Sequence, residues 1–160
     1  MRNLLGLLDY SLYGSERDTV SISEEIEFLD NYLDINTMRF GDKLKIDFEK
    51  DVENPGFEIA PLLLIPFIEN ATKHGIGHGE NNRIEVSLKQ KNQDLTFEVY
   101  NLKPDIFSDE KPTENITTGL GLNQVKSRLK IVYPDSHKLE IKEDEKSFRI
   151  SLKIHGKQQK

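Results

Sequence analysis

The chain has 160 residues and a formal net charge of −6 at pH 7, with 36% hydrophobic and 31% charged residues. This length allows one domain with a proper core, and the composition is that of a soluble globular protein. The acidic balance argues against a broad nucleic-acid-binding surface. The absence of cysteine excludes disulfides, thiol catalysis and cysteine-ligated zinc. The longest apolar run, Pro61 to Ile68, is far shorter than the ~20 residues of a membrane-spanning helix.

Two helices are predicted in the first forty residues. Residues 2–13 carry five leucines and few polar residues, which favours a helix with a wide apolar face that needs a partner helix. A second helix is predicted to begin at Ser21, because Ser21 and Glu24 have the spacing of a capping box. Apolar residues then recur at helical spacing up to Phe40, and Gly41 follows as a helix stop.

The middle of the chain alternates between strand and helix patterns. KLKIDFEKD, from residue 43, alternates apolar and charged residues and predicts a strand with one solvent face. Pro61 predicts the first turn of a helix through PLLLIPFIENATKHG. Residues 84–88 and 95–99 predict two strands joined by a tight turn.

After these strands, residues 103–118 are polar, contain two prolines and show no period, which predicts a long loop. A helix opened by glycines and a closing hairpin from Leu139 to Ile154 complete the chain. The predicted fold class is α+β: a two-layer sandwich with a mixed sheet of about five strands and about three helices, one sheet face covered by helices and the other in solvent.

Polar side chains gather at the end of the predicted PLLLIPFIENATKHG helix. Spacings of three and four residues bring together Glu69, Asn70, Lys73 and His74. An amide oxygen can ligate a hard cation such as Mg²⁺, and an ammonium group can contact phosphate. The alternative is an exposed helix end with a Glu–Lys pair and a glycine stop, and this segment alone favours it.

Two further signals follow along the chain. Asn101 ends a predicted strand, where its amide could hydrogen-bond a base edge or simply serve a turn. Gly119 and Gly121 lead into a helix, whose free N–H groups and dipole form an anion site, although glycines also serve flexible loop ends. The order of these signals suggests that they line one pocket.

Two of these segments resemble motifs of a known family. APLLLIPFIENATKHGI resembles the N box, and GLGLNQVKSRLKIVYP the glycine box, of the LytS-type sensor histidine kinases. Their catalytic domain is of the ATP-binding type shared with gyrases, heat-shock chaperones and mismatch-repair ATPases. The resemblance covers about residues 1–155. It implies the end of the dimerisation helices and a linker at 1–40, an ATP-binding catalytic domain at 41–155, and a loose tail at 156–160.

The resemblance also implies roles for the matching residues. Asn70 would coordinate the Mg²⁺ that bridges the ATP phosphates, Asn101 would face adenine, and residues 103–118 would form the ATP lid. The catalytic and phosphate-binding positions would be Glu69, Asn70, Lys73, His74, Gly119, Leu120, Gly121 and Leu122.

Three departures from the family pattern matter. Asn101 stands where the superfamily has an aspartate, and the glycines of D-x-G-x-G are absent from NLKPD, so weak or altered nucleotide binding is expected. Pro66 stands where gyrase-like ATPases carry a water-activating glutamate, which argues against hydrolysis by that route. None of the four histidines has the context of a phosphoacceptor, so a fragment of a longer kinase is expected.

The resemblance implies a protein histidine kinase that uses Mg²⁺ and ATP, transfers the γ-phosphate to a histidine on an upstream helix, and serves a response regulator. It also implies a homodimer formed through the N-terminal helices, and a cytoplasmic location with membrane attachment only through upstream segments. The alternative is a degenerate nucleotide-binding or dimerisation module without kinase activity. A hydrolytic ATPase of the chaperone type is disfavoured by Pro66.

Overall fold

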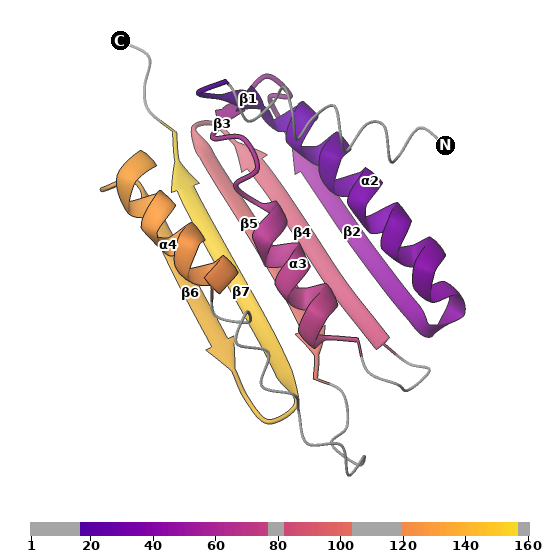
Figure 1. Cartoon of the computed structure of the whole chain (residues 1–160). Helices are drawn as coiled ribbons and strands as arrows, with labels where there is room; N and C mark the ends of the chain where they lie inside the picture. Colours follow the sequence, from indigo (N-terminus) through magenta and orange to yellow (C-terminus); the bar gives the residue numbers. More distant parts are fainter. Residues whose placement is uncertain (1–16, 77–81, 104–119, 157–160) are drawn as a thin grey trace.

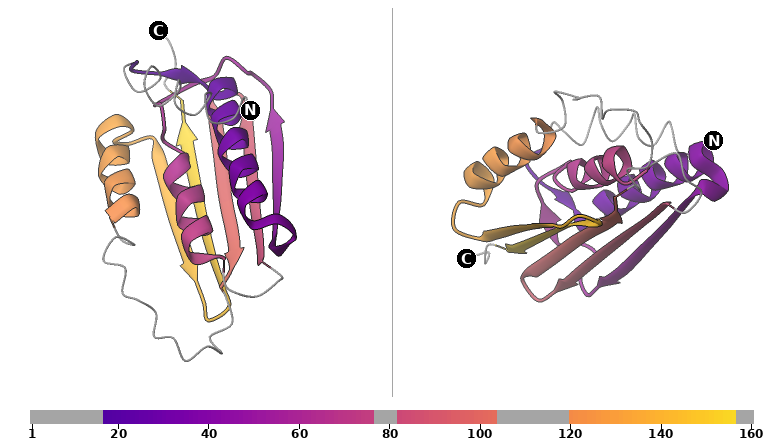
Figure 2. Two further views of the ribbon diagram at one scale, coloured as in Figure 1. Left: turned by 45° about the vertical axis from the view of Figure 1, so that its right-hand side comes forward. Right: turned by 90° about the horizontal axis from the view of Figure 1, so that it is seen from below.

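The computed structural model describes residues 17–76, 82–103 and 120–156. In these residues, three α-helices cover one face of a five-stranded sheet, as Figures 1 and 2 show. In chain order the elements are β1 (Val20–Ser21), α2 (Ile22–Phe40), the 3₁₀ turn η2 (Gly41–Lys43), β2 (Leu44–Val52), β3 (Glu58–Ile59), α3 (Ile65–His74), β4 (Asn82–Lys91), β5 (Asp94–Leu102), α4 (Leu120–Val132), β6 (His137–Glu143) and β7 (Ser147–His155). The helix predicted at 2–13 and nearly all of the predicted 103–118 loop lie outside the described residues.

The sheet is mixed, with strand order β2-β4-β5-β7-β6. β2 runs parallel to β4, and the other neighbours are antiparallel. Side chains along a strand alternate between the two faces of the sheet, so every second residue of β4 and β5 faces the helices and is buried. The predicted α+β fold class, with one helix-covered face, is confirmed.

The capping box predicted at Ser21 is present. The Ser21 hydroxyl accepts from the Glu24 amide at 3.2 Å, and the Glu24 carboxylate accepts from the Ser21 amide at 2.9 Å. Gly41 follows the helix with φ 57°, a left-handed conformation that suits glycine. Local sequence signals therefore define both ends of α2.

The predicted start of α3 at Pro61 is wrong: the helix begins at Ile65. Leu62 has φ 58°, which a right-handed helix does not allow, and residues 61–64 form a turn followed by a bend. Pro66 occupies the first turn of α3, where its missing N–H would have no helical partner. The apolar run is nevertheless buried, with Leu63 and Leu64 fully enclosed.

The core lies between the helix layer and the sheet. Phe67 of α3 packs on Phe97 of β5, with ring centroids 6.2 Å apart. Val125 and Leu129 form the buried face of α4, as their helical spacing predicts. The C-terminal end of α3 and the end of β5 lie at the same end of the molecule, where the β6–β7 turn also projects (Figure 1).

Candidate functional site

The last two turns of α3 change from buried to exposed side chains. Ile68 and Ala71 are buried against the sheet, whereas Lys73 and His74 are exposed. Glu69 and Asn70 are half-buried beside them. The polar end of α3 therefore carries a carboxylate, an amide and two basic side chains: Glu69, Asn70, Lys73 and His74.

Asn101 lies directly against this helix end. It is 1% exposed, and its amide nitrogen donates to the carbonyl of Leu102 at 3.2 Å. A Cβ added at Gly75 would lie 2.8 Å from both the Cβ and the Nδ2 of Asn101, and 2.6 Å from the carbonyl oxygen of Ala71. The absence of a side chain at Gly75 thus allows α3 to approach β5, and the fold brings two of the three predicted polar signals together.

Gly75 was not predicted as a site residue. The sequence identified it only as a helix stop, which requires nothing of its surroundings. Its φ is −95°, so any residue could adopt its backbone conformation. The requirement for glycine here is steric, and it comes both from the Ala71 carbonyl of the same helix and from Asn101, which lies 26 positions further along the chain.

The third predicted signal is described only in part. α4 begins at Leu120, Leu122 packs partly buried against the core, and among the described residues no atom lies within 4 Å of a Cβ added at Gly121. Gly119 and the side chain of Leu120 lie outside the described residues.

Lys103 and Glu143 are further charged residues at this end, and sequence reasoning missed both. The Lys103 ammonium lies 2.6 Å from a Glu143 carboxylate oxygen, and the Lys103 amide donates to the carbonyl of Lys146 at 2.8 Å. These contacts attach the end of β5 to the β6–β7 turn. Because they join residues about forty positions apart, no local sequence pattern indicates them.

His74 has a pKa below the usual value of 6.5. The main cause is partial burial, and the neighbouring Lys73 ammonium adds to it, while the Glu143 carboxylate opposes the shift. The imidazole is therefore largely neutral near pH 7, and it lies within electrostatic range of the Glu143 carboxylate on β6.

The residue types at this end suit a magnesium–phosphate ligand. Asn70 offers an amide oxygen, which is a ligand that Mg²⁺ accepts, and Lys73 offers an exposed ammonium group for phosphate. Within residues 17–76, 82–103 and 120–156 there is no group of three His, Asp or Glu residues that could hold a metal by itself. A metal here would thus share its coordination with phosphate oxygens and water, as Mg²⁺ usually does.

The chain is similar to curated sensor kinases. It is 28% identical over 137 residues to the sensor histidine kinase BtsS of Escherichia coli, covering 84% of this chain and 24% of BtsS. It is 29% identical over 91 residues to the sensor protein LytS of Enterococcus faecalis, covering 56% and 15% of the two chains. With the sensor protein kinase HptS of Staphylococcus aureus it shares 36% identity over 75 residues, covering 47% and 14%. The chain thus spans about a quarter, or less, of the length of these relatives.

Solved structures share the fold. The catalytic domain of histidine kinase ThkA in a nucleotide-free form aligns with TM-score 0.55 at 20% identity, over 86% of this chain and 93% of that one. Full-length ShkA in complex with AMPPNP aligns with TM-score 0.59 at 15% identity, over 95% and 34% of the chains. ThkA in complex with the response regulator TrrA aligns with TM-score 0.56 at 18% identity, over 98% and 48%.

A family model described as histidine kinase matches residues 1–44, a range that includes all of α2. None of the described helices has the length and apolar content that crossing a bilayer requires. Sequence similarity and fold agree with the resemblance noted from the N box and glycine box. The chain is a homologue of the sensor histidine kinases and has the fold of their catalytic domains.

Proposed function

We propose that this chain is the ATP-binding catalytic domain of a two-component sensor histidine kinase, and that it positions the γ-phosphate of Mg²⁺-ATP for transfer to a histidine. The observation that carries the proposal is the packing of the polar α3 end on Asn101 across Gly75. The complex of the neighbour ShkA with AMPPNP supports a nucleotide as the ligand. The complex of ThkA with TrrA supports a response regulator as the partner.

In this proposal Asn70 ligates Mg²⁺, and Glu69, Lys73 and His74 surround the phosphates. Mg²⁺ would supply charge neutralisation between the phosphate groups. The start of α4, with Gly119, Leu120, Gly121 and Leu122, contributes backbone N–H groups. Phosphoryl transfer depends mainly on such positioning and charge stabilisation, so no general base is needed at Pro66.

The acceptor histidine is proposed to come from outside this sequence. His155 pairs with Asp94 in the sheet register, whereas Asn101 pairs with Phe148. Asn101 lies seven positions after Asp94 on β5, which is about 23 Å at 3.3 Å per residue. His137 begins β6 at the same distant end, opposite Ile154. Neither of these histidines is within reach of a phosphate held at the α3 end.

The organisation proposed for the whole protein follows from the family. Residues 1–40 would continue the dimerisation helices and linker, 41–155 would form the catalytic domain, and 156–160 would be a tail. A homodimer would form through the N-terminal helices, and the domain would work on the cytoplasmic side.

A second candidate is a degenerate nucleotide-binding or dimerisation module. Asn101 favours it, because an amide oxygen accepts a hydrogen bond from an adenine amine without the charge assistance that an aspartate gives. The two candidates differ in nucleotide affinity and in phosphoryl transfer.

Titration calorimetry with Mg²⁺ and a non-hydrolysable ATP analogue tests the proposal. We expect saturable binding that Asn70→Ala weakens about tenfold or more, equivalent to about 1.4 kcal/mol, with most of the Mg²⁺ dependence lost. Asn31→Ala is the matched control, since Asn31 is also a half-buried helical asparagine, but on α2. No binding at millimolar nucleotide would reject the kinase proposal in favour of the degenerate module.

A further inference from the structure

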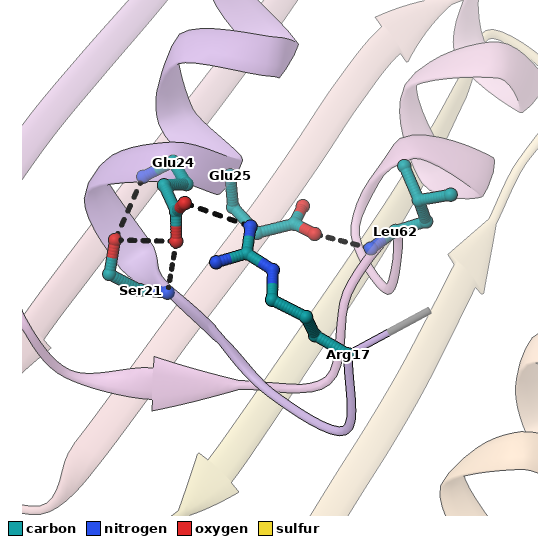
Figure 3. Close-up of polar contacts among 5 residues, drawn as sticks. All are labelled: Arg17, Ser21, Glu24, Glu25 and Leu62. Atoms are coloured by element: carbon teal, nitrogen blue, oxygen red, sulfur yellow. Dashed lines mark hydrogen bonds and ion pairs between the residues drawn. The ribbon is translucent and has the colours of Figure 1, made fainter. Parts of the chain in front are cut away.

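A buried carboxylate lies at the end of the helix layer opposite the candidate site. Glu24 is half-buried and completes the capping box and an ion pair with Arg17 at 2.9 Å, whereas its neighbour Glu25 is fully buried. A carboxylate in the interior is costly unless hydrogen-bonded. In Figure 3 the Glu25 side chain reaches across from α2 and accepts a hydrogen bond from the backbone amide of Leu62.

Leu62 has an unusual backbone conformation. Among the described residues, Leu62 and Asn92 are the non-glycine residues with positive φ. Asn92 lies in the tight β4–β5 turn, where asparagine tolerates this conformation well. Leucine does not favour it, so the conformation at Leu62 needs support from its surroundings, and the Glu25 carboxylate supplies a contact there.

The same segment is held from the other side by α4. Tyr133 follows the last turn of α4 and is 7% exposed, and its hydroxyl accepts from the backbone amide of Ala60 at 3.0 Å. Residues 60–62 are thus fixed between a side chain from α2 and a side chain from α4. Burial raises the pKa of Tyr133, and the negative charge of Glu25 adds to the shift, in keeping with the closeness of the two groups.

This segment determines where α3 begins. α3 starts at Ile65, three residues after Leu62, and continues without interruption to His74. Asn70 is five residues from the start of the helix, about 7–8 Å along its axis at 1.5 Å per residue. A short helix moves as a unit, so a change of backbone conformation at Leu62 would shift or rotate Asn70, Lys73 and the Gly75 contact with Asn101.

We infer that Glu25 is a positioning residue for the candidate nucleotide site, and that its contact with Leu62 transmits the position of α2 to the polar end of α3. α2 lies within residues 1–44, the segment that the histidine kinase family model matches. The expected effect of Glu25 on nucleotide affinity rests on the proposed function, whereas its effect on the position of α3 does not.

The test compares Glu25→Ala, Glu25→Gln and Tyr133→Phe with Ile154→Val. Gln keeps an oxygen that can accept from the Leu62 amide, whereas Ala removes it. Tyr133→Phe keeps the ring and removes the acceptor for Ala60, and it serves if Glu25→Ala does not fold. Ile154 is 2% exposed and lies on β7, where it pairs with Leu95 and His137, so the valine variant loosens the core from a different part of the fold.

Two measurements are made on each folded variant of the full chain. Hydrogen exchange of the nucleotide-free chain should be about tenfold faster at the Leu62 amide and at the last turn of α3 in Glu25→Ala, and close to wild type in Glu25→Gln. Affinity for Mg²⁺ and the ATP analogue should fall about threefold to tenfold in Glu25→Ala, and less in Glu25→Gln.

The inference would be overturned if hydrogen exchange at the end of α3 were no faster in the Glu25 and Tyr133 variants than in Ile154→Val. Glu25 would then have a purely structural role. Faster α3 exchange with unchanged affinity would overturn the link to the nucleotide site. If the wild-type chain binds no nucleotide, the proposed function fails, and α3 exchange alone then decides whether Glu25 positions the helix.

Discussion

Gly75→Ala should damage the chain at the point where α3 meets β5. The added Cβ would lie 2.6 Å from the carbonyl oxygen of Ala71 and 2.8 Å from the Cβ and Nδ2 of Asn101. Two of these three neighbours are atoms that cannot rotate away, since one is backbone and one is a Cβ. The helix end must therefore move by several tenths of an ångström, or Asn101 must move.

The magnitude follows from two opposing effects. Overpacking of a close contact costs about 1–3 kcal/mol. Replacing glycine with alanine also restricts the unfolded chain, which stabilises the fold by about 0.4–1 kcal/mol where the native φ is compatible, and the φ of −95° at Gly75 is compatible. The net loss should be about 1–2 kcal/mol, or a fall in Tm of about 3–6 °C for a chain of this size.

Thermal unfolding and calorimetry with Mg²⁺ and the ATP analogue measure the two consequences. Nucleotide affinity should also fall, because the polar end of α3, which carries Asn70, can no longer approach Asn101 as closely as it does across Gly75. Gly56→Ala is the control, since a Cβ there meets only the Asn54 Oδ1 at 3.4 Å, an ordinary contact. A Gly75→Ala chain as stable as wild type, with unchanged affinity, would refute the steric account of this glycine.

Two further predictions concern Ser21 and His74. Ser21→Ala removes the cap that accepts from the Glu24 amide and should cost about 1 kcal/mol, or about 2–4 °C in Tm. Ser23→Ala, at an exposed position two residues further along, should not lower the Tm, and equal Tm values for both variants would contradict the cap. His74 has a lowered pKa, so its contribution to stability is present above pH 6.5 and is lost as the pH falls through the folded-state value. Phosphates that bind beside His74 should raise its pKa, so nucleotide binding near pH 6 should be accompanied by proton uptake. Calorimetry in buffers of different ionisation enthalpy measures this uptake, which His74→Asn should abolish. Binding heats of the wild type that do not depend on the buffer would remove His74 from the phosphate site.

Local sequence patterns predicted most of the elements correctly. The capping box at Ser21, the alternation in β4 and β5 and the helical spacing in α4 all express short-range physics, and the structure has each element where the pattern indicates. The start of α3 was the exception. Pro61 is a sound helix-start signal, but a tertiary contact from Glu25 accompanies the left-handed Leu62 that delays the helix to Ile65.

Periodicity and spacing are local properties, so the fold class, the two motifs and the identity of the polar residues at the α3 end could be predicted from the amino-acid sequence. Three contacts became visible only in the folded chain: Gly75 packs on Asn101, Lys103 pairs with Glu143, and Glu25 lies buried against the segment before α3. These contacts join residues that are about 26 to 40 positions apart. Their existence depends on how the helices sit on the sheet, which no local pattern encodes.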